Sequence, residues 1–378
     1  MRGNIRRNGV FAIWKGKLPR EILEVGQQGY SAAEPVVYPE GIEVIDCGLG
    51  TNPLGMSDAL KRFLAAGKDT NLCDYPTPEP EALKGALAEA FPGWNLAPDR
   101  LFLSGGSMGV LLNLARVLFR PGSLVSGVSP QFTDTGLQAL YNGALYRPIR
   151  LEPPRYAIGT ARLMEELEKS PDVLYLDRPN NPTGQVFPLE ELEKVAKVAL
   201  ETGTWVISDE AYGDFIPDSE SAACLDLPNV VTCRSFSKGR GAAGIRVGFA
   251  VVRDPDLDRL LKTVQPAFAV GTLDGEMAAA ALGDTGFLER TLAYVKLAKG
   301  RTLEAIERRP EWSVADTDPG TPILLLSQEG GSLVNRLAAV GISCEAGTGF
   351  FDLDDRSVRL RVPAPEKLDA FLERLAKA

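Results

Sequence analysis

Residues 235–248 have the sequence SFSKGRGAAGIRVG, which places one lysine just past a predicted strand. Lys238 lies among small hydroxyl side chains and glycines, and Arg246 follows eight residues later. A lysine that reacts as a nucleophile must lose its proton, and nearby positive charge and desolvation both lower a lysine pKa. A single lysine is usually a solvated surface residue, so any functional role for Lys238 has to be inferred from the neighbouring segments.

The same stretch contains G-x-G-x-x-G at residues 239–244, the spacing of a dinucleotide-binding turn. That fingerprint requires a helix immediately after the glycines. Residues 247–252 are apolar and rich in valine, and they predict a strand instead. The sequence therefore disfavours a nicotinamide-dependent dehydrogenase.

Three further segments precede this stretch in the chain, and each lies at or just past the end of a predicted strand: SGGSM at 104–108, NNPTG at 180–184 and ISDEAY at 207–212. A glycine turn that opens a helix offers free N–H groups and the positive end of the helix dipole to a phosphate. Carboxylates at the end of a parallel strand point into the crevice where α/β proteins bind ligands. Each segment alone is commonly structural, and their fixed order is what indicates a cofactor site.

Strands and helices alternate along the middle of the chain and predict a mostly parallel sheet with helices on both faces. The predicted strands are 101–103, 124–128, 144–149, 173–177, 204–208, 230–234 and 247–252. We expect an N-terminal arm over residues 1–45 that joins the small domain, a large domain over 46–265, and a linking helix with a smaller α+β domain over 266–378. In the last of these, helices are predicted at 275–282, 286–309 and 366–377, and strands at 322–326 and 358–362.

The composition excludes several classes of function. With 378 residues, a net charge of −9 and a pI near 5.0, the chain has no broad basic field for nucleic acid. No stretch approaches the ~20 apolar residues of a membrane span, no signal peptide is predicted, and five scattered cysteines favour reduced thiols in a cytoplasm. The chain has no histidine, which excludes Ser-His-Asp catalysis and removes the commonest ligand of catalytic zinc. We therefore expect no metal site.

The pattern S-x-S-K followed by G-x-R-x-G resembles the cofactor-lysine signature of fold-type I pyridoxal-phosphate (PLP) enzymes. With NNPTG and DEAY in order upstream, the chain is similar to the class I/II aminotransferases over roughly residues 45–375. GTNPLG at 50–55 and YPTP at 75–78 are typical of the branch that holds histidinol-phosphate aminotransferase and threonine-phosphate decarboxylase. The resemblance implies aminotransferase fold type I, with a mostly parallel seven-stranded sheet in the large domain and a smaller α+β domain.

The resemblance also implies roles for individual residues. Lys238 would bind PLP as a Schiff base and then transfer protons, and Asp209 would pair with the pyridine nitrogen. Asn181 and Tyr212 would hold the ring hydroxyl oxygen, while Phe132 would stack on the ring. The residues implied around the phosphate are Gly106, Ser107, Met108, Ser235, Ser237 and Arg246.

Further implied contacts reach beyond the cofactor. Tyr75 matches a tyrosine that contacts the phosphate of the neighbouring subunit, which implies a homodimer with shared sites. Arg359 matches the arginine that clamps the substrate carboxylate, and Asn181 and Asn52 would also contact the substrate. The implied reaction is transamination between an L-amino acid and a 2-oxo acid. A decarboxylase, an elimination or cyclisation enzyme, and a non-catalytic binding protein remain alternatives.

Glu345 departs from the pattern of the branch. Histidinol-phosphate aminotransferase usually carries an arginine after Gly-Ile-x-Val, whereas here residues 341–344 are followed by a glutamate. A carboxylate at this position would repel a substrate phosphate or pair with a cationic substrate. Gln131 and Thr135, near the stacking aromatic, also differ from the common pattern and leave the side-chain specificity open.

Overall fold

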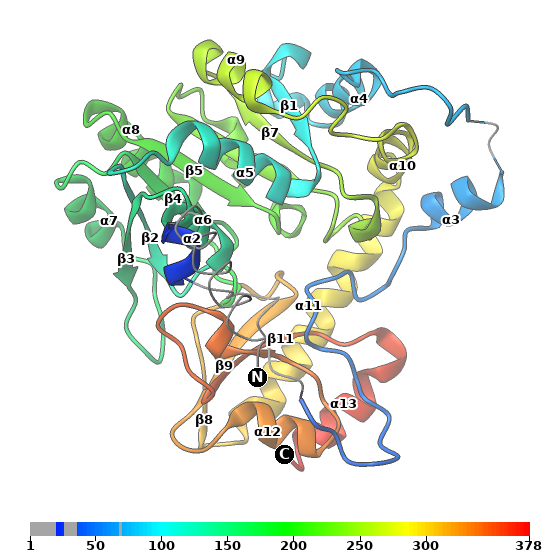
Figure 1. Cartoon of the computed structure of the whole chain (residues 1–378). Coiled ribbons are helices and arrows are strands. Elements are labelled where there is room, and N and C mark those ends of the chain that lie inside the picture. The colour runs from blue at the N-terminus through cyan, green and yellow to red at the C-terminus, as the bar shows by residue number, and fades with distance from the viewer. Residues whose placement is uncertain (1–19, 26–35, 68–69) are drawn as a thin grey trace, which may run out of the picture.

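The computed structural model describes residues 20–25, 36–67 and 70–378, and their strands form one sheet of seven strands and one of four (Figure 1). The arm expected over residues 1–45 lies mostly outside these ranges. Its described part contains a short helix, α2 (Arg20–Val25). In the same ranges, no helix is both long enough and apolar enough to cross a membrane.

The large sheet has the strand order β1-β7-β6-β5-β4-β2-β3. Strands β2 to β6 pair in parallel, and β7 pairs antiparallel with β1 and β6. The predicted seven-stranded, mostly parallel sheet is confirmed. The bounds are β1 (Leu101–Ser104), β2 (Leu124–Ser129), β3 (Leu145–Arg150), β4 (Val173–Asp177), β5 (Trp205–Glu210), β6 (Val230–Ser235) and β7 (Gly248–Val252).

Helices cover both faces of this sheet, because its central strands are apolar on both sides. In β4, Tyr175 packs in the cluster formed with α5 (Gly106–Leu118), α6 (Thr133–Tyr141) and α9 (Pro255–Val264). The next residue, Leu176, packs on the opposite face against α7 (Thr160–Leu167) and α8 (Leu189–Glu201). Beyond β7, a further cluster holds α3 (Asp58–Ala65), α4 (Glu81–Ala90) and α10 (Thr272–Leu282). Each central strand is thus buried between two helical layers.

The small sheet is antiparallel, with the strand order β10-β11-β9-β8. Its strands are β8 (Trp312–Val314), β9 (Ile323–Gln328), β10 (Glu345–Ala346) and β11 (Ser357–Arg361), and its helices are α12 (Leu333–Ala339) and α13 (Leu368–Leu375). The long helix α11 (Thr285–Glu307) runs from the large sheet to this part of the molecule (Figure 1).

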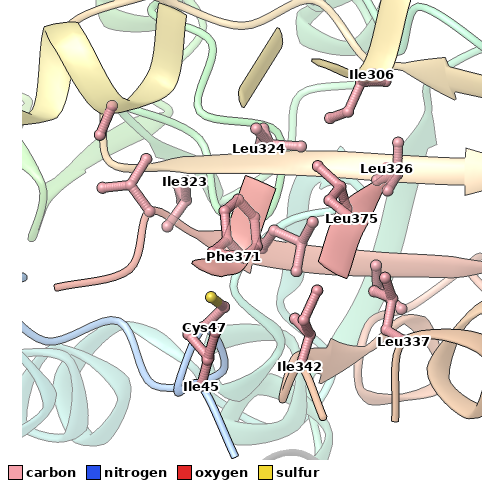
Figure 2. Packing of buried hydrophobic residues seen from close by; sticks show 14 of the residues in the cluster. Ile45, Cys47, Ile306, Ile323, Leu324, Leu326, Leu337, Ile342, Phe371 and Leu375 are labelled. Carbon is pink, nitrogen blue, oxygen red and sulfur yellow. The ribbon is translucent and has the colours of Figure 1, made fainter. Parts of the chain in front are cut away.

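The core under the small sheet is closed by a segment from near the N-terminus. Figure 2 shows Ile45 and Cys47 beside Ile342, below Phe371 of α13 and the strand that carries Leu324. Ile45 forms an isolated parallel bridge with Ile342, so the chain near residue 45 lies against the segment that leads into the edge strand β10. This arrangement places residues 46–49 next to β11, and Asn52 reaches the Lys238 loop of the large sheet.

Candidate active site

The polar segments identified in the sequence meet at the carboxyl ends of the central strands of the large sheet. Asp177 ends β4 and lies directly opposite Asp209 of β5 in the parallel register. The neighbouring strand β6 ends at Ser235 and leads into the loop that carries Lys238. Parallel pairing explains this convergence, because the carboxyl ends of adjacent parallel strands lie at the same edge of the sheet.

Asp209 is buried and fixed by two hydrogen bonds. Its Oδ2 accepts the hydroxyl proton of Tyr175 at 2.9 Å, and its Oδ1 accepts the N–H of Ala211 at 3.0 Å. Burial raises the pKa of Asp209 to about 6, although both hydrogen bonds and the charge of Lys238 lower it. A buried carboxylate of this kind is stabilised by a cationic partner placed against it.

Lys238 and Tyr212 lie against the same stretch of backbone. The Nζ of Lys238 is 5.2 Å from the centre of the Tyr212 ring. A side chain at Gly50 would collide with the Tyr212 hydroxyl and come within 3.1 Å of Lys238 Nζ. The Tyr212 hydroxyl is buried, and among the described residues it has no hydrogen-bond partner. Buried hydroxyls normally have a partner, so this oxygen is available to a bound group.

The glycine turn at the start of α5 forms a cradle with Arg246. Gly106 has a φ of +74°, and a Cβ there would lie 2.7 Å from the guanidinium of Arg246. Arg246 Nη1 donates to Ser237 Oγ at 3.2 Å, and Ser235 Oγ donates to the same hydroxyl at 2.9 Å. A helix start, two hydroxyls and a guanidinium in contact are a suitable environment for an anion.

Asp177 was not identified as a functional residue in the sequence. Its buried carboxylate accepts the N–H groups of Phe132 at 2.9 Å and Asn181 at 2.8 Å, and the side-chain amide of Asn180 at 2.8 Å. Burial raises its pKa to about 7, although these hydrogen bonds lower it. Asp177 therefore ties the loop that carries Phe132 to the NNPTG loop. Its position at the end of the predicted strand 173–177 could have identified it, because the same reasoning identified Asp209.

Arg359 brings the small sheet to the NNPTG loop. Its Nη1 donates to Asn181 Oδ1 at 3.0 Å and its Nη2 to the carbonyl oxygen of Gly48 at 2.6 Å. The side chain is buried, and the carboxylate of Glu345 lies 3.7 Å from Nη2.

Arg361, two residues further along β11, was also missed in the sequence. It donates to the carbonyl oxygen of Leu49 at 2.6 Å and to the Asp46 carboxylate at 2.7 Å. These bonds hold the backbone of residues 46–49 beside Arg359. Asp46 and Arg361 are 315 positions apart in the chain, and no local pattern predicts that pairing.

Asn52 and Tyr75 make contacts other than the predicted ones. The side-chain amide of Asn52 donates to the carbonyl oxygens of Lys238 and Gly239, so it contacts the lysine loop. Tyr75 is 82% exposed and stacks on Phe268 with ring centres 4.8 Å apart. The proposed roles of Asn52 toward a substrate and of Tyr75 toward a second subunit stay predictions.

Comparisons with known proteins give a consistent result. Residues 42–375 match the family described as aminotransferase class I and II. The chain is 31% identical to histidinol-phosphate aminotransferase of Symbiobacterium thermophilum over 346 residues, covering 89% of this chain and 91% of that one. It is 28% identical to histidinol-phosphate aminotransferase 1 of Mesorhizobium japonicum over 338 residues, covering 87% and 89%.

Solved structures share the fold. Histidinol-phosphate aminotransferase from Sinorhizobium meliloti, in complex with pyridoxal-5'-phosphate, superposes with a TM-score of 0.76 at 20% identity, covering 89% of this chain and 91% of that one. A single mutant of Thermus thermophilus aspartate aminotransferase superposes with a TM-score of 0.77 at 23% identity, covering 89% and 92%.

Proposed function

The chain belongs to the class I and II aminotransferase family and is a PLP-dependent aminotransferase, and we propose that Lys238 holds the cofactor during amino-group transfer between an L-amino acid and a 2-oxo acid. The observation that carries this assignment is the placement of Lys238 5.2 Å from the ring of the buried Tyr212, where its charge also lowers the pKa of the buried Asp209.

The described residues fit PLP in three respects. The Asp209 carboxylate suits a protonated ring nitrogen, because a cation against it would offset its burial. The Tyr212 hydroxyl has an open hydrogen-bonding position for the ring hydroxyl oxygen. The cradle of Gly106 and Arg246 suits the phosphate, and a Cβ at Gly106 would fill part of it.

When bound, PLP supplies an electron sink that stabilises negative charge at the substrate Cα. Asp209 would hold a proton on the ring nitrogen, and Asn181 and Tyr212 would hold the ring hydroxyl oxygen. Phe132 would cover one face of the ring. The phosphate would be held by Gly106, Ser107, Met108, Ser235, Ser237 and Arg246.

Lys238 would also move protons. Its amine, once released by the incoming substrate amine, would take the proton from the substrate Cα. The chain has no histidine to do this, so a lysine amine beside the reacting carbon is the leading candidate for a general base. Arg359 would orient the substrate through its carboxylate, with Asn181 and the Gly48 carbonyl fixing the guanidinium.

We also propose the domain division at about residues 46 and 265, a homodimer and a cytoplasmic location. The homodimer is supported by the exposed aromatic surface of Tyr75, with Leu72 exposed nearby in the same segment. A cytoplasmic location is supported by five cysteines that are all free thiols in the described chain.

Several relatives are named histidinol-phosphate aminotransferase, so a phosphate-bearing substrate is a second candidate. The carboxylate of Glu345 disfavours it, because a phosphate on the substrate side chain would be repelled near Glu345, while Arg359, 3.7 Å away, is assigned to the substrate's own carboxylate.

The cofactor assignment is tested by reduction of the purified enzyme with borohydride, followed by peptide mass spectrometry. We expect the reduced cofactor on Lys238, loss of the cofactor absorbance in Lys238→Ala, and normal labelling in the control Lys61→Ala, an exposed lysine. Labelling of another lysine would overturn the assignment. The reaction is tested by incubating the enzyme with amino-acid donors and measuring 2-oxo acid and carbon dioxide together. Carbon dioxide without 2-oxo acid would contradict transamination.

A further inference from the structure

Glu345 faces the same side of the small sheet as Arg359. The two residues are direct partners in the antiparallel register of β10 and β11. The residues on either side of Glu345, Cys344 and Ala346, pack against the core of the small sheet. Side chains alternate between the faces of a strand, so Glu345 and Arg359 both point away from that core.

The charge of Glu345 reaches the cofactor site. The pKa of the buried Tyr212 hydroxyl is raised by burial, lowered by Arg359 and Arg361, and raised by Glu345 and Asp177. Glu345 is thus one of the charged groups that act on this hydroxyl. Its side chain is only 14% exposed, and burial raises its pKa while Arg359 lowers it.

Two of the charged groups that act on the Tyr212 hydroxyl, Arg361 and Asp177, already have partners. Arg361 is paired with the Asp46 carboxylate at 2.7 Å. Asp177 accepts three N–H groups from the surrounding loops. Arg359 and Glu345 remain as a loose pair at 3.7 Å.

A substrate carboxylate on Arg359 would change this balance. The guanidinium of Arg359 would then pair with the substrate carboxylate, and the mostly buried carboxylate of Glu345 would lose its counter-charge. A buried charge without a counter-charge is unfavourable. The Glu345 side chain has three rotatable bonds, so its carboxylate can turn from Arg359 toward a new partner.

We propose that Glu345 selects amino-group donors whose side chain carries an ammonium or guanidinium group. This inference rests on the role proposed above for Arg359. A cationic side chain restores the counter-charge of Glu345, whereas a carboxylate or phosphate adds a second anion beside it. A flexible side chain of several methylene groups is needed, because the selected cation has to approach the region next to the substrate's own carboxylate.

The test uses the PLP-loaded enzyme and three amino acids that cannot lose a Cα proton: 2-methylornithine, 2-methylnorvaline and 2-methylglutamate. Their dissociation constants are measured by calorimetry. We expect the wild type to bind 2-methylornithine at least about 10-fold more tightly than the other two, as for a mostly buried charge pair. In Glu345→Gln this preference should fall to about one, and Glu345→Asp should retain part of it. Glu329→Gln, an exposed change of equal charge in the small domain, should leave it unchanged.

Other results would overturn the inference. If Glu345→Gln weakened the binding of all three ligands equally, the role of Glu345 beside Arg359 would be purely structural. An unchanged preference in that variant, a wild-type preference for 2-methylglutamate, or no binding of any ligand would also contradict selection by Glu345. Turnover of ornithine, norvaline and glutamate is measured separately. If the enzyme prefers 2-methylornithine but forms no 2-oxo acid, transamination is refuted and selection by Glu345 is not. If it forms 2-oxo acid but shows no binding preference, selection by Glu345 is refuted and transamination is not.

Discussion

The side-chain amide of Asn52 donates to the carbonyl oxygen of Lys238 at 3.1 Å and to that of Gly239 at 2.9 Å. It also donates to the hydroxyl of Thr291 on α11 at 3.2 Å. One buried amide therefore connects the N-terminal segment, the lysine loop of the large sheet and the long helix. Because Arg361 holds the same N-terminal segment, the position of Lys238 depends on contacts from both sheets.

Asn52→Ala should weaken the attachment of the lysine loop. The carbonyl oxygens of Lys238 and Gly239 would lose a buried donor, which costs about 1–3 kcal/mol. We expect a lower thermal midpoint and PLP affinity reduced by about tenfold, measured by cofactor titration. Thr291→Val is the control, because it removes the third partner and keeps both loop contacts. Equal PLP affinity in Asn52→Ala and the wild type would contradict this role.

The raised pKa of Asp209 predicts a pH dependence of the cofactor-free enzyme. Its folded-state pKa of about 6 exceeds the usual 3.8, so the folded state binds more protons between these values. The stability therefore falls as pH rises from 4 to 6, and above pH 6 the charged carboxylate costs roughly 3 kcal/mol.

Thermal midpoints of the cofactor-free wild type and Asp209→Asn, measured from pH 4.5 to 7.5, test this prediction. In Asp209→Asn the thermal midpoint should fall less steeply with rising pH than in the wild type. The remaining fall is the contribution of Asp177, whose pKa is also raised. PLP should reduce the decline in the wild type by placing a cation against Asp209. Parallel pH curves for both cofactor-free proteins would show that Asp209 does not titrate in this range.

The sequence predicted the elements that carry a strong local signal. Most strands of the large sheet are apolar runs bounded by turns, and the helix predicted at 286–309 is α11 (Thr285–Glu307). A single 3-10 turn (Ala243–Ile245) and then β7 follow G-x-G-x-x-G, which confirms that this glycine pattern does not open an α-helix. Helix α6 was missed because its first turn, residues 133–136, contains two threonines and a glycine, which have low helix propensity. Strand β10 has two residues, too few for any periodicity.

For the candidate site, the sequence identified residues in local patterns, such as Lys238 and Asp209. It missed Arg361, because its partners Asp46 and Leu49 come from the other end of the chain. It also gave no sign that the Asn52 amide contacts the backbone of the lysine loop. Both interactions depend on how the two sheets meet, which no local pattern encodes.

Lys299 should contribute strongly to stability. This buried lysine on α11 donates toward four oxygens, those of the Thr317 and Thr321 hydroxyls and the Asp318 and Ile323 carbonyls, at 2.6 to 2.8 Å. Burial lowers its pKa to about 7. Replacing it by methionine leaves these oxygens without their common donor, and we expect a loss of about 3 kcal/mol.

The thermal midpoint of Lys299→Met is compared with that of Lys296→Met. Lys296 is exposed on the same helix, and its replacement should change stability by less than about 0.5 kcal/mol. Similar midpoints for both variants would mean that the four oxygens find other partners. The Thr321 hydroxyl also lies 2.8 Å from the Gly184 carbonyl, so a large effect would extend to the NNPTG loop.

Tyr212→Phe should have opposite effects on the cofactor-free and the PLP-bound enzyme. Without cofactor the buried Tyr212 hydroxyl has no hydrogen-bond partner among the described residues, so its removal should be neutral or slightly stabilising. With PLP the hydroxyl would hold the ring oxygen, and its loss should weaken cofactor binding by about 1 kcal/mol. Tyr175→Phe is the matched control, because the Tyr175 hydroxyl donates to Asp209 at 2.9 Å and its loss should destabilise the cofactor-free enzyme. If Tyr212→Phe destabilised the cofactor-free enzyme as much as Tyr175→Phe, the hydroxyl would have a structural partner and would not be reserved for the cofactor.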